Sequence, residues 1–152
     1  RMEEERGIRV KKFRFLEDAW PHEFQTPSQK GYPEVFDLMS FWILRLDGEP
    51  IGYTGSLDMG HFHFVGNTFI LSEYRQMGYH SYLLKVRNAN LGLRPKITVL
   101  NPIDGTHMAN LVKVVQKLGY KPVMSYEDVN TIMSKQLFDE VTSGGQQLWR
   151  LD

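Results

Sequence analysis

The chain has 152 residues, no cysteine, and 18 basic side chains against 18 acidic ones. This length predicts one domain, residues 1–152, with its own hydrophobic core. The absence of cysteine excludes disulfides, thiolate zinc sites and cysteine nucleophiles, and it fits the reducing cytoplasm. A net charge of zero gives no overall attraction to nucleic acid or to a membrane surface, although a local basic patch leaves nucleic acid open as a partner.

The composition is that of a folded chain without a membrane segment. No stretch approaches the ~18 apolar residues of a membrane span, and the acidic start, Met2–Glu5, lacks the apolar segment of a signal peptide. Because Arg1 precedes a methionine, we expect the native chain to begin at Met2. An apolar content of 41% and an aromatic content of 12% argue against disorder.

The first third of the chain predicts one strand and then irregular structure. Residues 8–15 are β-branched and aromatic, which is typical of a strand. In residues 16–38 several helix-breaking residues exclude a long helix, so we expect only short helical pieces at 17–24 and 33–39. These breakers are Pro21, Pro27, Gly31 and Pro33.

A hairpin follows. The apolar runs Phe41–Leu46 and Ile51–Leu57 flank Asp47-Gly48, a dipeptide that favours the positive φ angles of a tight turn. A second turn at 58–60 leads to a further strand over roughly 61–71.

The period then changes to that of a helix. We expect this helix to end at Gly92, because Pro95 prevents its continuation. Four apolar residues at helical spacing form its inward face: Tyr79, Tyr82, Leu83 and Val86.

A second strand–helix unit comes next. Lys96–Leu100 predicts a short buried strand, and Thr106 can cap a helix that ends at Gly119. The expected inward residues of this helix are Met108, Leu111, Val112, Val115 and Leu118.

The last third predicts closing elements. We expect a strand at Lys121–Tyr126, a helix at 129–140 that covers the sheet or a partner chain, and a strand at Gln147–Leu151 after the Gly144-Gly145 turn. The whole order predicts an α/β chain with a mixed sheet, in which antiparallel hairpins precede a crossover unit.

The segment Ser72–Leu84 has the pattern of an anion site. A strand ends, a short loop follows and an amphipathic helix begins, so several backbone N–H groups at the helix start lack partners. The helix dipole favours an anion there, typically a phosphate, and Gly78 allows a close approach to the backbone. The alternative is an ordinary strand-to-helix connection that contains a glycine.

This segment resembles the acetyl-CoA-binding motif of the GNAT superfamily of N-acetyltransferases. Other segments in the expected order are similar to the family as well, and the match covers roughly residues 41–123. The matching residues of the motif are Glu73, Tyr74, Arg75, Gly78 and Leu84, and the other segments are Trp42–Tyr53, Val99–Pro102 and Lys117–Tyr120.

The resemblance implies a fold and an activity. The fold is a mixed, mostly antiparallel sheet of six to seven strands, with helices on both faces and a V-shaped split between the fourth and fifth strands. The activity is transfer of an acyl group from acetyl-CoA, or another acyl-CoA, to a primary amine of a small molecule or protein by direct attack in a ternary complex. Separately from the resemblance, a homodimer stays open as the assembly.

The resemblance also implies where the coenzyme binds. Its pyrophosphate would lie on the backbone N–H groups of residues 76–81, and its pantetheine arm would pair with the end of the strand near 69–71. The implied coenzyme-binding residues are Phe69, Ile70, Leu71, Arg75, Gln76, Met77, Gly78, Tyr79, His80, Ser81 and Asn101.

The candidates for the catalytic base lie on the strand predicted at 61–71. Alternation places His61, His63, Val65 and Asn67 on one face, where family members often carry a carboxylate. A histidine with a pKa near ~6.5 can deprotonate an ammonium directly or through water. The alternative is that these histidines lie on an exposed face or pack among aromatic residues. We expect no metal site, since a third ligand is missing nearby.

The chain departs from the family at two places. His80 stands where the motif has its second small residue, and its ring either crowds the pyrophosphate or adds a donor to it. Val115 stands where the family has the tyrosine that protonates the leaving thiolate, so Tyr120, Tyr126 or water would have to serve. Met108 and Leu111 also differ from the family's residues.

These departures favour a rival interpretation. The rival is a GNAT-fold protein without ordinary acetyl transfer, either a binding or regulatory module or a nucleic-acid-modifying relative with another donor. A purely structural or interaction domain is the third possibility.

Two weaker features complete the sequence. Residues 20–32 correspond to part of the family's acceptor pocket, and nearby carboxylates could attract a cationic amine. Those carboxylates are Glu23, Glu34 and Asp37.

The first predicted strand is basic, with Arg9, Lys11, Lys12 and Arg14. We interpret it as a solvated edge of the sheet rather than a nucleic-acid patch.

Overall fold

A computed structural model of the chain describes residues 7–27, 33–101 and 105–152. The strands are β1 (Ile8–Lys12), β2 (Ser40–Leu46), β3 (Glu49–Asp58), β4 (His63–Ile70), β5 (Lys96–Leu100), β6 (Lys121–Pro122) and β7 (Gln147–Leu151). The helices are α2 (Tyr79–Asn90), α3 (Gly105–Lys117) and α4 (Lys135–Thr142), with 3-10 turns η1 (Pro33–Leu38), η2 (Ser72–Tyr74) and η3 (Tyr126–Asp128).

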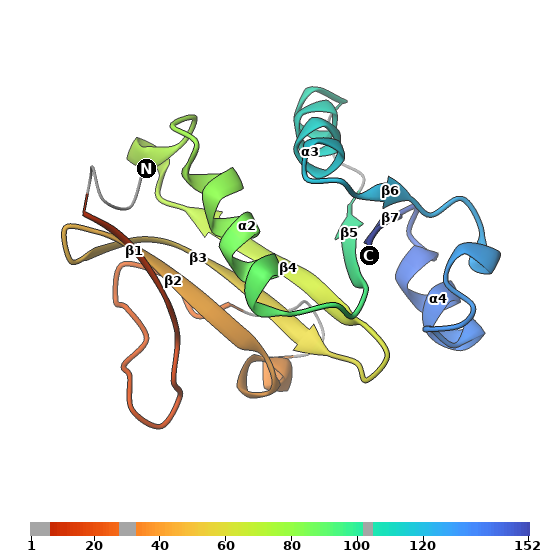
Figure 1. The fold of residues 1–152 in the computed structure, drawn as a ribbon, viewed down its shortest axis with the longest axis horizontal. Helices are drawn as coiled ribbons and strands as arrows, with labels where there is room; N and C mark the ends of the chain where they lie inside the picture. The colour runs from red at the N-terminus through yellow and green to blue at the C-terminus, as the bar shows by residue number, and fades with distance from the viewer. Residues whose placement is uncertain (1–6, 28–32, 102–104) are drawn as a thin grey trace. The chain divides into compact units, whose positions relative to one another are not determined.

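The strands of the described residues form one seven-stranded sheet in the order β1-β2-β3-β4-β5-β7-β6 (Figure 1). β1 with β2, β2 with β3, and β7 with both β5 and β6 are antiparallel pairs, whereas β4 and β5 are parallel. The predicted mixed α/β sheet is therefore confirmed.

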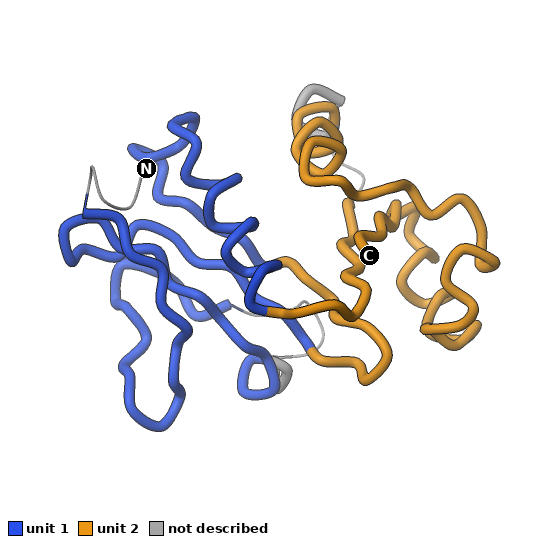
Figure 2. The backbone as a smooth tube through the Cα atoms, viewed as in Figure 1, with its two compact units in different colours: residues 1–57, 67–90 blue, residues 58–66, 91–152 orange. Residues whose placement is uncertain are grey.

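The chain forms two compact units. Unit 1 contains residues 1–57 and 67–90, and unit 2 contains residues 58–66 and 91–152 (Figure 2). The boundary runs through β4, so the first half of this strand belongs to unit 2 and the second half, from Asn67, to unit 1.

Unit 1 is built around the predicted hairpin, which is confirmed. Asp47 and Gly48 both have positive φ angles, 51° and 87°, which a tight turn between two strands requires. Strand β2 is buried on both faces, since Phe41 and Ile43 on one face and Trp42 and Leu44 on the other are all fully or nearly fully buried. One face of the sheet in unit 1 therefore needs a cover besides α2.

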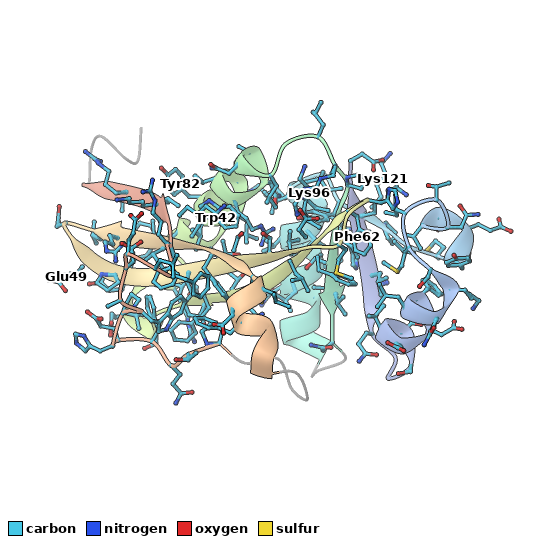
Figure 3. The ribbon with its side chains drawn as sticks, turned by 90° about the horizontal axis from the view of Figure 1, so that it is seen from below. Trp42, Glu49, Phe62, Tyr82, Lys96 and Lys121 are labelled. Carbon is cyan, nitrogen blue, oxygen red and sulfur yellow. The ribbon has the colours of Figure 1, made fainter. Side chains whose placement is uncertain are left out.

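Aromatic side chains supply that cover. The segment between β1 and β2 has almost no regular structure, but its rings pack edge to face, as Phe13 and Phe15 do at 4.8 Å between centroids. Figure 3 shows side chains crowded between the strands and this segment. The cluster consists of Phe13, Phe24, Met39, Phe41 and Ile43, with Phe15, Trp20, Phe36, Tyr53, Leu57, Phe69 and Leu71 packed against it. This segment is therefore held in place by the burial of its apolar side chains rather than by backbone hydrogen bonds to a neighbouring strand.

Unit 2 has a core on each face of its strands. The cluster that includes the residues of α3 contains Val65, Leu100, Val115, Tyr120 and Trp149. The cluster that includes the residues of α4 contains Phe62, Ile97, Val129, Met133 and Leu148. The inward face predicted for α3 is confirmed at Leu111, Val112, Val115 and Leu118, and Met108 lies outside the described side chains.

Several predicted boundaries were wrong. The first strand ends at Lys12 rather than Phe15, and residues 17–24 form turns rather than a helix, because their aromatic side chains fold inward individually. The helix predicted to start at Thr106 begins at Gly105, one residue earlier.

The closing elements are also shorter than predicted. β6 contains only Lys121 and Pro122, since proline has no N–H group to continue a ladder. The last helix begins at Lys135 rather than 129, because the hydroxyl of Ser134 accepts a hydrogen bond from the Leu137 N–H and caps the helix there. No helix among the described residues has the length and apolar character needed to cross a membrane.

Replacement of Gly52 by alanine tests the close approach of β3 to β4. A Cβ at Gly52 would lie 2.5 Å from Cδ1 of Ile70 and 2.8 Å from the carbonyl oxygen of Phe69. We expect Gly52→Ala to lower the free energy of unfolding by about 1–3 kcal/mol, as overpacking does. Chemical denaturation measures the change.

Gly66→Ala is the matched control. A Cβ at Gly66 would meet no atom within 4 Å, so we expect a change within about 0.5 kcal/mol. Equal effects of the two substitutions would contradict the close packing of β3 on β4.

Candidate functional site

The second half of β4 departs from ordinary strand geometry. The parallel ladder joins His63 to Lys96, Phe64 to Ile97 and Val65 to Thr98, and β4 continues beyond it to Ile70. Asn67 then has a φ angle of +52°, which bends a strand locally and interrupts its alternation, as a bulge does. The printed ladder with β5 therefore covers only the first three residues of β4.

The loop after β4 exposes backbone donors. The N–H groups of Tyr74 and Arg75 donate to the carbonyls of Leu71 and Ser72, at 2.9 and 3.3 Å. The next N–H group with an acceptor in the described part of the chain is that of Tyr82, which donates to the Gly78 carbonyl at 3.1 Å. The N–H groups of residues 76–81 therefore remain available to a ligand.

The backbone of this loop gathers those donors. Gln76 and Gly78 have φ angles of +61° and +87°, and left-handed residues in a loop turn successive N–H groups toward one concave side. α2, which is 12 residues long, begins at Tyr79, so its dipole adds partial positive charge at the same place. The predicted anion site thus has the geometry of an anion-binding loop.

Arg75 ties this loop to the end of β4. Its Nε donates to the carbonyl of Ile70 at 2.8 Å, and its guanidinium lies 5.4 Å from the ring centroid of Phe69. The N–H of Leu71 in turn donates to the Ile51 carbonyl of β3 at 2.8 Å. The loop is therefore anchored at both strands.

His80 occupies the second position of α2 and is half-buried. Burial lowers its pKa below the ordinary value, and the nearby Arg87 lowers it further. A neutral imidazole is compatible with the positive end of the helix dipole, whereas an imidazolium would oppose it.

A chain of buried hydrogen bonds, the polar bridge, connects α2 to β3 and β4. Arg87 is only 2% exposed, and its Nη1 donates to Oγ1 of Thr54 at 2.8 Å. Thr54 Oγ1 lies 2.8 Å from Oγ1 of Thr68, the residue after Asn67. The bridge therefore joins the helix that starts at the exposed N–H groups to the part of β4 that follows the bend.

Sequence reasoning missed Arg87. Its signal was present, because Tyr79, Leu83 and Arg87 are spaced four residues apart and all three are buried. An arginine on an otherwise apolar stripe indicates a polar group beneath the helix, here the Thr54 hydroxyl.

Two of the predicted base candidates lie in unit 2. His61 is exposed and precedes β4, so the predicted strand starts two residues too early. His63 is buried, and neither of its ring nitrogens has a hydrogen-bond partner in the described part of the chain. Burial lowers the pKa of His63, Arg94 and Lys96 lower it further, and Asp58 opposes them.

Asn67, the third candidate, lies in unit 1. Its side chain is exposed, and its Nδ2 lies 3.5 Å from Sδ of Met39. The single face predicted for the strand is wrong at this residue, because a positive φ interrupts the alternation.

The candidates for the leaving-group acid also lie in unit 2. Tyr120 is buried in the same cluster as Val115, and its N–H donates to the Val115 carbonyl at 3.0 Å. The hydroxyl of Tyr126 donates to the Met133 carbonyl at 2.7 Å, which gives it a structural partner. Asn101 is exposed directly after β5. Among the described residues no group of three or more His, Asp or Glu could hold a metal ion.

A double-mutant cycle tests the polar bridge. We expect Arg87→Met and Thr54→Val each to lower the free energy of unfolding by about 1–3 kcal/mol, because each removes the buried hydrogen bond between Arg87 Nη1 and Thr54 Oγ1. The double variant should lose less than the sum, with a coupling of about 0.5–3 kcal/mol. Urea denaturation measures all four proteins.

Arg87→Lys is the conservative control, since its ammonium can still donate to Thr54. Additive losses in the cycle would show that Arg87 stabilises the fold independently of Thr54.

Comparison with known proteins places the fold. No protein-family model matches the chain, and no curated protein sequence matches it. Solved structures do match over nearly the whole chain. A GNAT family acetyltransferase from Elizabethkingia anophelis, solved with acetyl-CoA bound, has a TM-score of 0.66 at 13% identity and covers 95% of this chain and 97% of its own.

Two further structures agree with it. The IAA acetyltransferase from Bacillus cereus has a TM-score of 0.62 at 13% identity, with 94% of this chain and 96% of that chain covered. An acyl-CoA N-acyltransferase from Pseudomonas aeruginosa has a TM-score of 0.59 at 14% identity, with 95% and 99% covered. The chain has the fold of the GNAT acetyltransferases, as its motifs predicted.

Proposed function

We propose that this chain is an acyl-CoA-dependent N-acyltransferase whose donor is acetyl-CoA or a related thioester. The observation that supports this most is the set of N–H groups at residues 76–81, which have no acceptor in the described part of the chain and lie at the start of α2. The GNAT fold adds support, since one solved structure of this fold holds acetyl-CoA.

The coenzyme would bind to unit 1 in this proposal. Its pyrophosphate accepts hydrogen bonds from residues 76–81, at a helix start where anions are stabilised. Its pantetheine amides pair with the backbone of residues 69–71. Arg75, bound to the Ile70 carbonyl, holds the loop and the strand together for both contacts.

The reaction would be a direct acyl transfer. The amine nitrogen of a small molecule or protein attacks the thioester carbonyl, the C–N bond forms, and the C–S bond then breaks to release the thiolate. A backbone N–H of β4 stabilises the intermediate oxyanion, a contact whose loss typically costs about 3 kcal/mol. The reaction takes place in the cytoplasm, in a monomer or homodimer.

In this proposal the protons are transferred by the residues that the sequence analysis identified as catalytic candidates. His63 or His61 accepts the amine proton directly or through a water molecule, which Asn67 can orient by hydrogen bonding, and Tyr120 supplies a proton to the thiolate. The lowered pKa of His63 supports its role, because a base must be neutral at the start of the reaction.

Gly78→Asp tests the coenzyme site. A carboxylate next to a pyrophosphate costs several kcal/mol, so we expect the Kd for acetyl-CoA to rise by at least about a hundredfold. Isothermal titration calorimetry measures binding. Because the chain has no cysteine, a thiol-reactive dye reads released coenzyme A without background from the protein.

Gly48→Asp is the matched control. Gly48 has the same φ angle as Gly78, 87°, and lies in the hairpin turn, so its replacement introduces the same backbone strain without a predicted effect on binding. If Gly78→Asp binds acetyl-CoA as the parent does, the assignment of residues 76–81 is wrong.

Single substitutions test the proton-transfer residues. Among His61→Ala, His63→Gln, Asn67→Ala and Tyr120→Phe, we expect the true base and acid to lower kcat by roughly 10²–10⁴-fold with little change in the KM for acetyl-CoA. Loss of a histidine base should also remove the acidic limb of the pH–rate profile. If none of these variants lowers kcat, water performs both proton transfers.

The rival function is a GNAT-fold binding or regulatory module, or a nucleic-acid-modifying relative with another donor. Two observations favour it: His80 is half-buried where the family motif has a small residue, and Val115 is buried in the cluster with Tyr120 where the family has its acid. Absence of both binding heat and thermal stabilisation with acetyl-CoA would support this rival. Salt-dependent binding to DNA would support its nucleic-acid version.

A further inference from the structure

The β1 edge of unit 1 contains a cavity of about 160 Å³. β1 is the terminal strand of the sheet, with β2 beside it. The residues that line the cavity are Lys11, Lys12, Phe13, Asp18, Ile43 and Arg45. None of them belongs to the proposed coenzyme site.

Two of the lining cations lie on one face of the strand pair. In the β1–β2 ladder Lys11 pairs with Ile43, and Arg9 pairs with Arg45. Because side chains alternate along a strand, Lys11 and Arg45 share the face that carries Ile43. The ammonium of Lys12 instead lies 5.9 Å from the ring centroid of Trp42.

These two cations have no counter-ion within the described part of the chain. Neither Lys11 nor Arg45 forms an ion pair or a side-chain hydrogen bond there. A bound anion would pair with both cations.

The rest of the cavity limits which anion fits. Phe13 and Ile43 are buried and form an apolar floor. Asp18 adds an acceptor, and one of its oxygens, Oδ2, already receives the Arg14 N–H at 2.8 Å. A phosphate group suits this mixture, because its oxygens accept from lysine and arginine and its protonated form donates to a carboxylate. A carboxylate ligand has no such donor.

We propose that this cavity binds the phosphate group of a phosphorylated ligand. Its volume is below the ~300–1,000 Å³ of ordinary small-molecule sites, so it accommodates one phosphate group and a few attached atoms. The rest of the ligand extends into solvent over the edge strand. The site is separate from acyl transfer and does not depend on the proposed function.

NMR titration of amide resonances tests the proposal with inorganic phosphate and phenyl phosphate, at constant ionic strength. We expect shifts in residues 11–13, 18 and 43–45, and a roughly tenfold weaker Kd in both Lys11→Gln and Arg45→Gln. Lys113→Gln, an exposed residue of α3, is the matched control and should bind as the parent does. The same spectra report whether each variant is folded.

The Gly78→Asp background separates this site from the coenzyme site, and phosphate should shift residues 11–13 there as in the parent. Tighter binding of phenyl phosphate than of a phosphoserine peptide indicates a small-molecule source, and the reverse indicates a phosphorylated protein. Equal weakening in all three variants, equal binding of acetate, or shifts confined to residues 76–81 would overturn the proposal.

Discussion

The backbone N–H groups that lie open at the start of α2 place a strong requirement on the residues of unit 1 around them. A backbone donor is tolerated without a protein acceptor only where water or a ligand can reach it. Gln76, Met77 and Gly78 are exposed, which meets that condition, while Tyr79 directly after them is 2% exposed and fixes the helix start against unit 1. The loop can therefore be open to a ligand and still have a defined position.

The two faces of the sheet in unit 1 help to fix the position of the loop before α2 in different ways. One face carries the aromatic cluster, against which Phe69 packs and which holds a long irregular segment without backbone ladders. The other face carries the hydroxyls of Thr54 and Thr68 and the guanidinium of Arg87, joined by directional hydrogen bonds. Apolar packing sets the distance between layers, whereas the hydrogen bonds set the register of α2 on β4.

Much of the site could be predicted because its signals are local. The Asp47-Gly48 turn and the loop at Gly78 each depend on neighbours a few residues away, and the structure has both. The predicted stripe of α2 is confirmed at Tyr79 and Leu83, whereas Tyr82 and Val86 are only half-buried and Leu84 and Arg87 are buried instead. The burial of His63 could not be predicted, since alternation along a strand does not say which face is covered. Burial of this ring without hydrogen-bond partners follows from packing within unit 2.

The order of the elements, the hairpin, the loop at Gly78 and the resemblance that the fold comparison supports could all be inferred from the sequence alone. The bend at Asn67, the bridge from Arg87 to Thr68 and the pairing of Arg9 with Arg45 between β1 and β2 became known only from the folded structure. Turn and helix preferences act over a few residues, so the sequence displays them directly. Strand register and buried polar contacts join residues far apart in the chain, and only the packed fold selects them.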